Sequence, residues 1–334
     1  MAAVISENHI EQVFIQEFID LGYEYINGAV ISPDGAAQER EFNEVVLKHR
    51  LESAINAINT LIPNEAKEEA LRKVLRTASP NLFQNNYQFH KYLTEGVDVE
   101  FRKGDRIAGD KVWLIDYAHP EKNEFLVVNQ FTIIEGNVNK RPDLILFING
   151  LPLVVIELKN AADQNTDISS AFNQLQTYKK VIPTLFQYNA LLIASDGWEA
   201  VFGSLTSPRQ FFLPWKSIDG KVVADETIPQ MEVMLKGMLN KKVLLDLMRH
   251  FTLFHINKDE MTKVIPRYHQ YFAVNKAVDT TKRAISERGD KRAGVVWHTQ
   301  GSGKSLTMVF YAGKLVLELN NPTLVVLTDR NDLD

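Results

Sequence analysis

The sequence predicts an α/β protein made of two successive domains, the first with a mixed central sheet flanked by helices. Three patterns support this prediction. Apolar residues recur with helical periodicity near the N-terminus, strand-like segments fill much of 97–205, and a glycine-rich turn joins a hydrophobic segment to a helical one within 294–319. We place the boundary near residue 255, so that the first domain spans 1–255 and the second 256–334.

The N-terminal part is predicted to be mainly helical. In residues 9–21 the apolar side chains share one helical face, and Gly22 follows as a stop signal. A second helix is predicted over 38–62 and ends there because Pro63 cannot continue helical hydrogen bonding. Residues 64–95 are predicted to be helix or turn.

The middle of the chain is predicted to form the sheet. Alternating or wholly apolar segments of strand length follow one another there, and Asp196-Gly197 marks a turn between the last two. The expected strands cover 97–102, 111–117, 124–134, 141–159 and two segments within 188–205, and helices are expected at 170–180 and 228–254. Polar residues 255–266 are expected to connect the domains, and 294–298 to form a strand of the second domain.

Composition indicates an ordinary globular protein. Hydrophobic residues make up 45% of the 334 residues, and no apolar run approaches the roughly 20 residues of a membrane span. The chain has no cysteine, which excludes disulfides and thiolate metal sites, and we expect a cytoplasmic location without membrane contact. Because the net charge is −5, binding of nucleic acid would require local basic patches or a partner subunit.

The stretch RPDLILFINGLPLVVIELK, residues 141–159, carries charged residues at both ends of apolar strand material. Alternation puts Glu157 and Lys159 on one face of a strand, and Asn149-Gly150 predicts a hairpin turn. A two-residue loop would point Asp143 and Glu157 to opposite faces, whereas a three-residue loop, Ile148-Asn149-Gly150, would return them to one face. We therefore predict the three-residue loop.

Two carboxylates that converge at a sheet edge are hard oxygen ligands suited to Mg²⁺, so Asp143 and Glu157 are the predicted metal ligands. Lys159 on the same face could orient or deprotonate a water molecule and offset charge at a scissile phosphate. This is the chemistry of phosphodiester cleavage. The alternative interpretation of the pattern is a solvated strand end beside a salt bridge.

The spacing of Pro142-Asp143 and the later E-x-K at Glu157 resembles the core of the PD-(D/E)xK nucleases. Gln174 and Tyr178 match a Q-x-x-x-Y motif that follows this core in one branch of those nucleases, and their i, i+4 spacing puts both on one helical face. The resemblance implies a nuclease-supporting role for this pair and also for Glu11, an acidic residue of the first helix. A helix surface pair is the alternative for Gln174 and Tyr178, and Glu7 and Glu17 compete with Glu11.

Residues 294–319 run from a hydrophobic segment through a glycine-rich turn into a helix, which predicts a phosphate-binding loop. Backbone amides beside Gly301 and Gly303 would surround phosphate oxygens, Lys304 would reach the β- and γ-phosphates of ATP, and Ser305 would ligate Mg²⁺. His298 departs from the strict motif, which has glycine there. The remaining residues Thr299, Gln300 and Ser302 complete a loop that resembles motif I of superfamily 2 helicases and implies the start of a RecA-like domain.

Two further segments flank this loop. Residues 267–273, RYHQYFA, resemble the adenine-reading Q motif of such ATPases, with Gln270 as the residue that would hydrogen-bond the adenine edge. Downstream, TLVVLTDRNDLD at 323–334 is predicted to contain a strand and resembles motif Ia, which would bring Thr328, Asp329 and Arg330 near DNA.

A PD-(D/E)xK nuclease followed by these helicase motifs is similar to the restriction (R, motor and endonuclease) subunit of type I restriction-modification enzymes. The resemblance implies Mg²⁺-dependent cleavage of double-stranded DNA, ATP-driven translocation, and association with methyltransferase (M) and specificity (S) subunits. It also implies that the sequence is the N-terminal portion of a longer polypeptide. Two alternatives stay open: a helicase or translocase whose nuclease-like domain only binds DNA, and a structural adaptor in which both sites are vestigial.

Overall fold

The computed structural model describes residues 7–104, 106–160, 168–257 and 260–327. Its centre is a six-stranded mixed sheet with the strand order β1-β4-β7-β8-β9-β10, in which β1 pairs with β4 and β8 pairs with β9 in parallel and the other neighbours are antiparallel. The strands are β1 (Glu24–Asn27), β4 (Phe125–Asn129), β7 (Leu144–Ile148), β8 (Leu151–Leu158), β9 (Leu191–Ser195) and β10 (Ala200–Gly203). The prediction of a mixed central sheet flanked by helices is confirmed.

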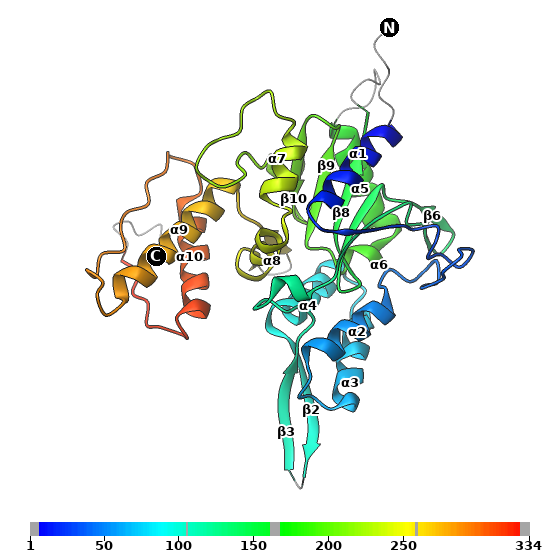
Figure 1. The fold of residues 1–334 in the computed structure, drawn as a ribbon, viewed down its shortest axis with the longest axis horizontal. Coiled ribbons are helices and arrows are strands. Elements are labelled where there is room, and N and C mark those ends of the chain that lie inside the picture. Colours follow the sequence, from blue (N-terminus) through cyan, green and yellow to red (C-terminus); the bar gives the residue numbers. More distant parts are fainter. Residues whose placement is uncertain (1–6, 105, 161–167, 258–259, 328–334) are drawn as a thin grey trace.

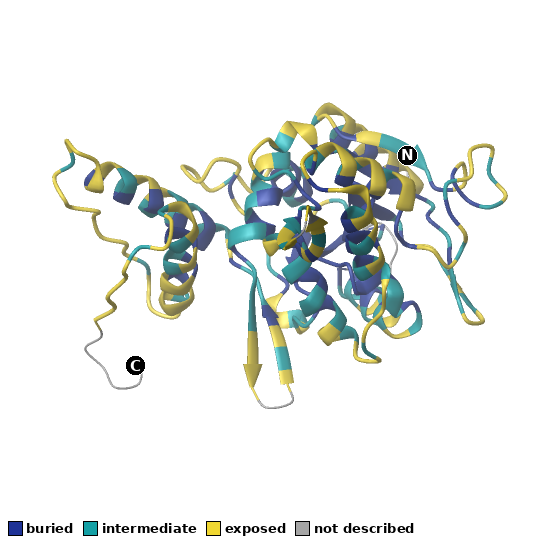
Figure 2. Ribbon diagram, turned by 90° about the horizontal axis from the view of Figure 1, so that it is seen from below, coloured by how far each residue is buried: buried dark blue, intermediate teal, exposed yellow. Residues whose placement is uncertain are grey.

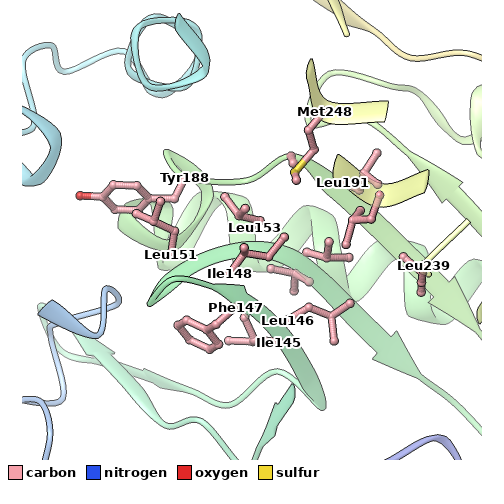
Figure 3. Close-up of a cluster of buried hydrophobic side chains, with 14 of the residues drawn as sticks. Ile145, Leu146, Phe147, Ile148, Leu151, Leu153, Tyr188, Leu191, Leu239 and Met248 are labelled. Atoms are coloured by element: carbon pink, nitrogen blue, oxygen red, sulfur yellow. The ribbon is translucent and has the colours of Figure 1, made fainter. Parts of the chain in front are cut away.

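The inner strands of this sheet are buried on both faces. Every residue of β4, β7, β8 and β9 is buried, as their nearly continuous Val, Ile, Leu and Phe sequences require. Helices α1 (Glu7–Asp20) and α5 (Ile168–Val181) lie against the sheet, the latter in contact with β8 and β9 (Figure 1). Figure 3 shows part of the core between the sheet and neighbouring elements, where Ile145, Phe147, Leu191 and Met248 gather.

The remaining helices of the first domain surround this core. They are α2 (Lys48–Ile58), α3 (Asn64–Leu75), α4 (Leu82–Glu95), α6 (Pro183–Phe186), α7 (Gln230–Gly237) and α8 (Lys241–His250), with short 3₁₀ turns at Pro120–Lys122 and Arg209–Phe211. The predicted helix over 38–62 is wrong in its first part, since α2 begins only at Lys48. The buried Arg40 guanidinium donates to the carbonyl oxygens of nearby Glu44 and distant Thr132, and these bonds hold residues 38–47 in an irregular path.

Three two-stranded hairpins lie outside the central sheet. They are β2 (Val97–Lys103) with β3 (Arg106–Val112), β5 (Ile133–Glu135) with β6 (Val138–Lys140), and β11 (Leu253–Asn257) with β12 (Glu260–Val264). The β2–β3 hairpin projects from the body in both ribbon views (Figures 1 and 2), and the strand predicted at 111–117 ends at Val112. The β11–β12 hairpin occupies the segment that was predicted to be a polar connection.

The segment predicted to begin a second domain contains helices α9 (Tyr268–Ile285) and α10 (Lys304–Glu318), which pack against each other (Figure 1). The predicted strand at 294–298 is wrong: this segment is not a strand, and Val295 and Trp297 are 94% and 80% exposed. A strand needs a neighbour to pair its backbone groups, and the described residues offer none to this segment. No helix among the described residues has both the length and the apolar character needed to cross a membrane.

Candidate functional site

The β7–β8 hairpin turns through two residues, so the predicted three-residue loop is wrong. Ile148 pairs with Leu151, and Asn149 and Gly150 between them have φ values of 51° and 77°. Both residues are thus left-handed, as the tight hairpin turns that match strand twist require, and Asn-Gly is the dipeptide best suited to them. The Asn149 side chain adds hydrogen bonds to the backbone of Leu114 and Glu124, which fix the turn to the rest of the domain.

A bulge in β8 nevertheless brings the two carboxylates to one face. Phe147 pairs with Pro152 but Leu146 pairs with Val154, so Leu153 is an extra residue without a partner in this ladder. Beyond it the pairing runs evenly to Leu144 and Ile156. One further step of this register places Asp143 opposite Glu157, and directly opposite residues in an antiparallel pair share a face.

The three predicted catalytic side chains lie together at this end of the hairpin. The backbone N–H of Leu158 donates to Asp143 Oδ2 at 2.7 Å, and Lys159 Nζ donates to Glu157 Oε1 at 2.8 Å and to the Leu158 carbonyl oxygen at 2.9 Å. Glu157 is 1% exposed, whereas Asp143 and Lys159 are half-buried. The backbone N–H of Lys159 also donates to Ser195 of β9, so the site stands on the centre of the sheet.

Helix α5 directs Gln174 and Tyr178 toward the same place. Gln174 Nε2 donates to the Tyr178 hydroxyl at 3.0 Å, and that hydroxyl lies 3.4 Å from the Arg141 carbonyl oxygen. Burial raises the pKa of Tyr178 far above its ordinary value, and the neighbouring charges of Glu157 and Asp143 raise it further. The phenol is therefore neutral at physiological pH and can serve the site as a hydrogen-bond donor.

Glu11 of α1 is buried and held by two residues that sequence reasoning missed. Asn129 Nδ2 donates to Glu11 Oε1 at 2.6 Å, and Gln130 Nε2 lies 3.4 Å from Oε2. Asn129 pairs with Leu144, so Gln130 is level with Asp143 in the sheet, and Gln130 has a left-handed φ of 53°. A polar Asn-Gln pair at the end of the apolar strand 125–128 was the signal that could have identified them.

The donor set suits a hard divalent cation, although the described residues contain no group of three or more acidic or histidine side chains arranged to hold a metal ion. Asp143 and Glu157 supply carboxylate oxygens from adjacent strands, as Mg²⁺ prefers, and a lysine lies beside them. Mg²⁺ ordinarily retains several water ligands, so two carboxylates are enough protein ligands for it.

The predicted phosphate loop is formed at the start of α10. Gly301 and Gly303 have φ values of 78° and 81°, and the helix begins directly at Lys304. Lys304 Nζ donates to the carbonyl oxygens of His298 and Thr299, each at 3.1 Å, so the lysine closes over its own loop. Gln300, Ser302 and Ser305 lie within the loop and the first helical turn, where backbone N–H groups and the helix dipole favour an anion.

Gln270 contacts this loop directly. Its Nε2 donates to the Gly303 carbonyl oxygen at 3.0 Å, and its Oε1 accepts from the Arg267 backbone N–H at 2.8 Å. His269 Nε2 lies 3.2 Å from the Ser302 carbonyl oxygen. The structure thus brings Gln270 to the loop, and adenine reading by it stays a prediction. Thr328, Asp329 and Arg330 lie outside the described residues.

Comparisons with known proteins extend this picture. Residues 4–211 match the family model described as "Type I restriction enzyme R protein N terminus". The chain belongs to this family. Residues 269–334 also match the family model described as "SWI2/SNF2 ATPase".

Curated relatives agree with the family. The chain is 42% identical over 99% of its length to the "Type I restriction enzyme HindI endonuclease subunit" of Haemophilus influenzae, covering 32% of that protein. It is 35% identical over its whole length to the "Putative type I restriction enzyme MjaIXP endonuclease subunit" of Methanocaldococcus jannaschii, covering 34% of it. The chain therefore spans about a third of the length of these R protein relatives.

Proposed function

We propose that this chain carries the nuclease site and the ATP phosphate loop of a type I restriction R protein. The nuclease would cut double-stranded DNA with Mg²⁺, and cleavage would be coupled to ATP-driven translocation in an assembly with methyltransferase and specificity subunits. The observation that carries the proposal is the placement of Asp143 opposite Glu157 with Lys159 bonded to Glu157. A cytoplasmic location and the domain boundary near 255 remain predictions.

The nuclease residues divide the work of phosphodiester hydrolysis. Asp143 and Glu157 would hold Mg²⁺, which when bound supplies Lewis acidity at a phosphate oxygen and lowers the pKa of a water molecule. Lys159 would orient the attacking water and compensate charge at the scissile phosphate, since its ammonium group lies at the carboxylate site and 16% of its side chain is exposed. Tyr178 and Gln174 would hold the substrate strand, and Glu11 would support the acidic edge.

The ATP-binding residues lie on a separate element. Backbone N–H groups from Thr299 to Ser305 would surround the phosphates, with Lys304 released from its loop carbonyls to reach the β- and γ-phosphates. Ser305 would ligate the Mg²⁺ that accompanies ATP. Since the chain spans about a third of its R protein relatives, complete ATP hydrolysis and translocation would require the full-length polypeptide.

Reciprocal variants of the full-length polypeptide test this division, in complex with its methyltransferase and specificity subunits. We expect Asp143→Ala to abolish Mg²⁺-dependent DNA cleavage while ATP hydrolysis continues, and Lys304→Ala to abolish ATP hydrolysis. Cleavage of plasmid DNA and release of phosphate would be measured on the same preparations. If the Asp143→Ala complex cleaved DNA at the full rate, the predicted site would not be catalytic. That result would favour the alternative of a helicase or translocase whose nuclease-like domain only binds DNA. Absence of both activities from the unaltered complex would favour the adaptor.

A further inference from the structure

A closed polar triangle joins three helices at the junction between the first domain and the ATPase segment. Lys314 Nζ of α10 donates to Asp246 Oδ1 of α8 and to Asn275 Oδ1 of α9, both at 2.6 Å. Asn275 Nδ2 completes the triangle by donating to Asp246 Oδ2 at 3.1 Å. Lys314 is only 6% exposed, so its charge depends on these partners.

The acidic member of the triangle comes from outside the ATPase segment. Lys314 and Asn275 lie within residues 269–334, which match the ATPase family, whereas Asp246 belongs to α8. Helix α8 and the segment before it are fixed to the first domain. Lys241 Nζ donates to the Gly22 carbonyl oxygen, and the Tyr23 hydroxyl donates at 2.7 Å to the Leu239 carbonyl oxygen.

Lys314 is the cation that Asp246 pairs with at neutral pH. His250 on the same helix is 3.9 Å from Asp246, but burial and the nearby charge of Lys314 lower its pKa to about 4. The imidazole is therefore neutral under physiological conditions. Lys314 Nζ lies 5.2 Å from the centre of the Phe251 ring, which itself packs against Phe310 with ring centroids 5.6 Å apart. This apolar neighbour lowers the local dielectric and strengthens the electrostatic attraction.

A single helix connects this pair to the phosphate loop. Lys314 lies ten residues after Lys304, the first residue of α10, or about 15 Å along the helix axis. At the loop itself, Gln270 of α9 holds the Gly303 carbonyl oxygen. Helix α10 is thus held by α9 at its start and by α8 further along, and these two attachments fix the direction in which its N-terminus points.

We infer that Asp246 is a positioning residue for the phosphate loop, through which the last helix of the nuclease domain sets the ATP affinity of the motor segment. Asp246 does not touch the nucleotide; it holds Lys314, and Lys314 holds α10. The inference rests on the ATP binding proposed above. It gives the two domains a defined physical link, because a shift of α8 relative to the sheet would move the loop that binds the phosphates.

The test compares two carboxylates whose ion pairs connect α10 to a neighbouring helix, Asp246 on α8 and Glu318 on α10 itself. Asp246→Asn removes the anion supplied by the nuclease domain, and Glu318→Gln removes the exposed Lys282–Glu318 pair, which lies within the ATPase segment. Binding of ATP with Mg²⁺ to the full-length polypeptide would be measured by calorimetry. We expect Asp246→Asn to raise Kd about tenfold and Glu318→Gln to change it less than about twofold.

A double-mutant cycle then separates a local effect from general destabilisation. Lys314→Gln should weaken ATP binding as much as Asp246→Asn, and the double variant should be no weaker than either, because each removes the same interaction. Equal shifts for Asp246→Asn and Glu318→Gln, unchanged affinity in Asp246→Asn, or additive effects in the double variant would each overturn the inference.

Two controls keep the outcomes distinct. If the unaltered polypeptide binds ATP no better than its Lys304→Ala variant, the ATP part of the proposed function fails, and the inference fails with it. If circular dichroism shows that the Asp246→Asn variant does not fold, Lys314→Arg replaces it, since this variant keeps the charge but changes its reach. A several-fold rise in Kd in the folded Lys314→Arg variant supports the inference, and unchanged affinity overturns it.

Discussion

The nuclease hairpin and the phosphate loop are built in opposite ways. Strands β7 and β8 lie between β4 and β9, all residues of both strands are buried, and the charged side chains extend from a finished sheet. The phosphate loop and α10 are equally well formed, yet the flanking segments 294–298 and 322–327 are not strands and are largely exposed. One site therefore stands on long-range strand pairing and the other on a helix N-terminus.

This difference shows which parts of a functional motif form locally. A glycine-rich turn and the helix after it satisfy their backbone groups within a few residues, so they need no distant partner. A strand cannot pair its backbone N–H and C=O groups within itself, and each neighbouring strand provides hydrogen-bond partners for about half of them. Sites built on helix termini therefore depend less on strand partners distant in sequence than a site at the end of a β-hairpin does.

The largest expected effect concerns catalysis at the nuclease hairpin. Lys159→Met should reduce DNA cleavage about 10²–10⁴-fold, because it removes the group proposed to orient the attacking water. Lys180→Met, which changes an exposed lysine of α5, is the matched control and should reduce cleavage far less. Initial rates of plasmid cleavage by the assembled complex would be compared. Similar losses in the two variants would mean that both lysines serve only DNA binding.

The contrast in packing can be tested with two aromatic residues. Phe147→Ala removes a ring that is fully buried in β7 and should lower the free energy of unfolding by about 3–5 kcal/mol. Trp297→Ala, at a side chain that is 80% exposed, should change it by less than about 0.5 kcal/mol. Urea denaturation followed by circular dichroism gives both values. If Trp297→Ala lowered the free energy of unfolding nearly as much as Phe147→Ala, segment 294–298 would be packed like the nuclease hairpin and the contrast between the two regions would fail.

Two left-handed glycines provide a finer comparison. Gly150 and Gly301 have nearly equal φ values, 77° and 78°, but a Cβ at Gly150 would lie 2.4 Å from the Leu47 carbonyl oxygen, whereas Gly301 has open space. We expect Gly301→Ala to cost about 1 kcal/mol and Gly150→Ala at least about 2 kcal/mol. Thermal unfolding of the two variants measures the difference. Equal costs would show that the β7–β8 turn relaxes away from Leu47 easily.

The β11–β12 hairpin, which lies between the nuclease hairpin and the phosphate loop in the sequence, should make the free energy of unfolding depend on pH. Lys263 of β12 is buried against Asn86 and the Asn189 carbonyl oxygen, and burial lowers its pKa from 10.5 to about 7. Between these values the unfolded chain binds a proton that the folded chain does not. The Lys263 contribution therefore raises the free energy of unfolding as pH increases, by at most about 1.4 kcal/mol per unit.

Lys263→Met should remove this contribution. The neighbouring His90 has its pKa lowered to about 3, chiefly by burial, and remains neutral throughout the range. Urea denaturation at pH 7, 8 and 9 would show a smaller increase of stability for the variant than for the unaltered chain. Parallel pH profiles would mean that Lys263 keeps its charge in the folded state.

Sequence patterns predicted the elements whose signals are local. The apolar strands around 144–158, the helix with Gln174 and Tyr178, and the phosphate loop with its helix all form where they were expected. The three catalytic candidates meet because the strand register aligns them, but that register arises from a bulge at Leu153. Pro152 beside it, which has no N–H to give to a strand ladder, was a signal for that bulge that the loop-length prediction did not use. The predicted three-residue loop is therefore wrong, but the placement of Asp143 and Glu157 on one face, which it was meant to explain, is produced by the bulge.

The other errors share a cause in long-range contacts. Residues 38–47 have helical periodicity but are held in an irregular path by the buried Arg40, whose partner Thr132 is distant in sequence. Residues 255–266 were expected to be a polar connection. The strands of the β11–β12 hairpin pair with each other, but the burial of the polar residue Lys263 depends on Asn86 of α4 and on the Asn189 carbonyl oxygen before β9. Asn129 and Gln130 were missed because only the folded chain brings Glu11 beside them.

Leu153, the extra residue of the bulge, makes β8 one residue longer between the turn and Glu157 than an even ladder around a two-residue turn requires. Loss of a single residue from 151–156 can be absorbed if the strands pair evenly around the same turn, which again leaves Asp143 facing Glu157. Gain of a single residue has no such remedy, since it demands a wider turn or a second irregularity. Length variation in this hairpin should therefore be one-sided, with shortening tolerated and lengthening selected against.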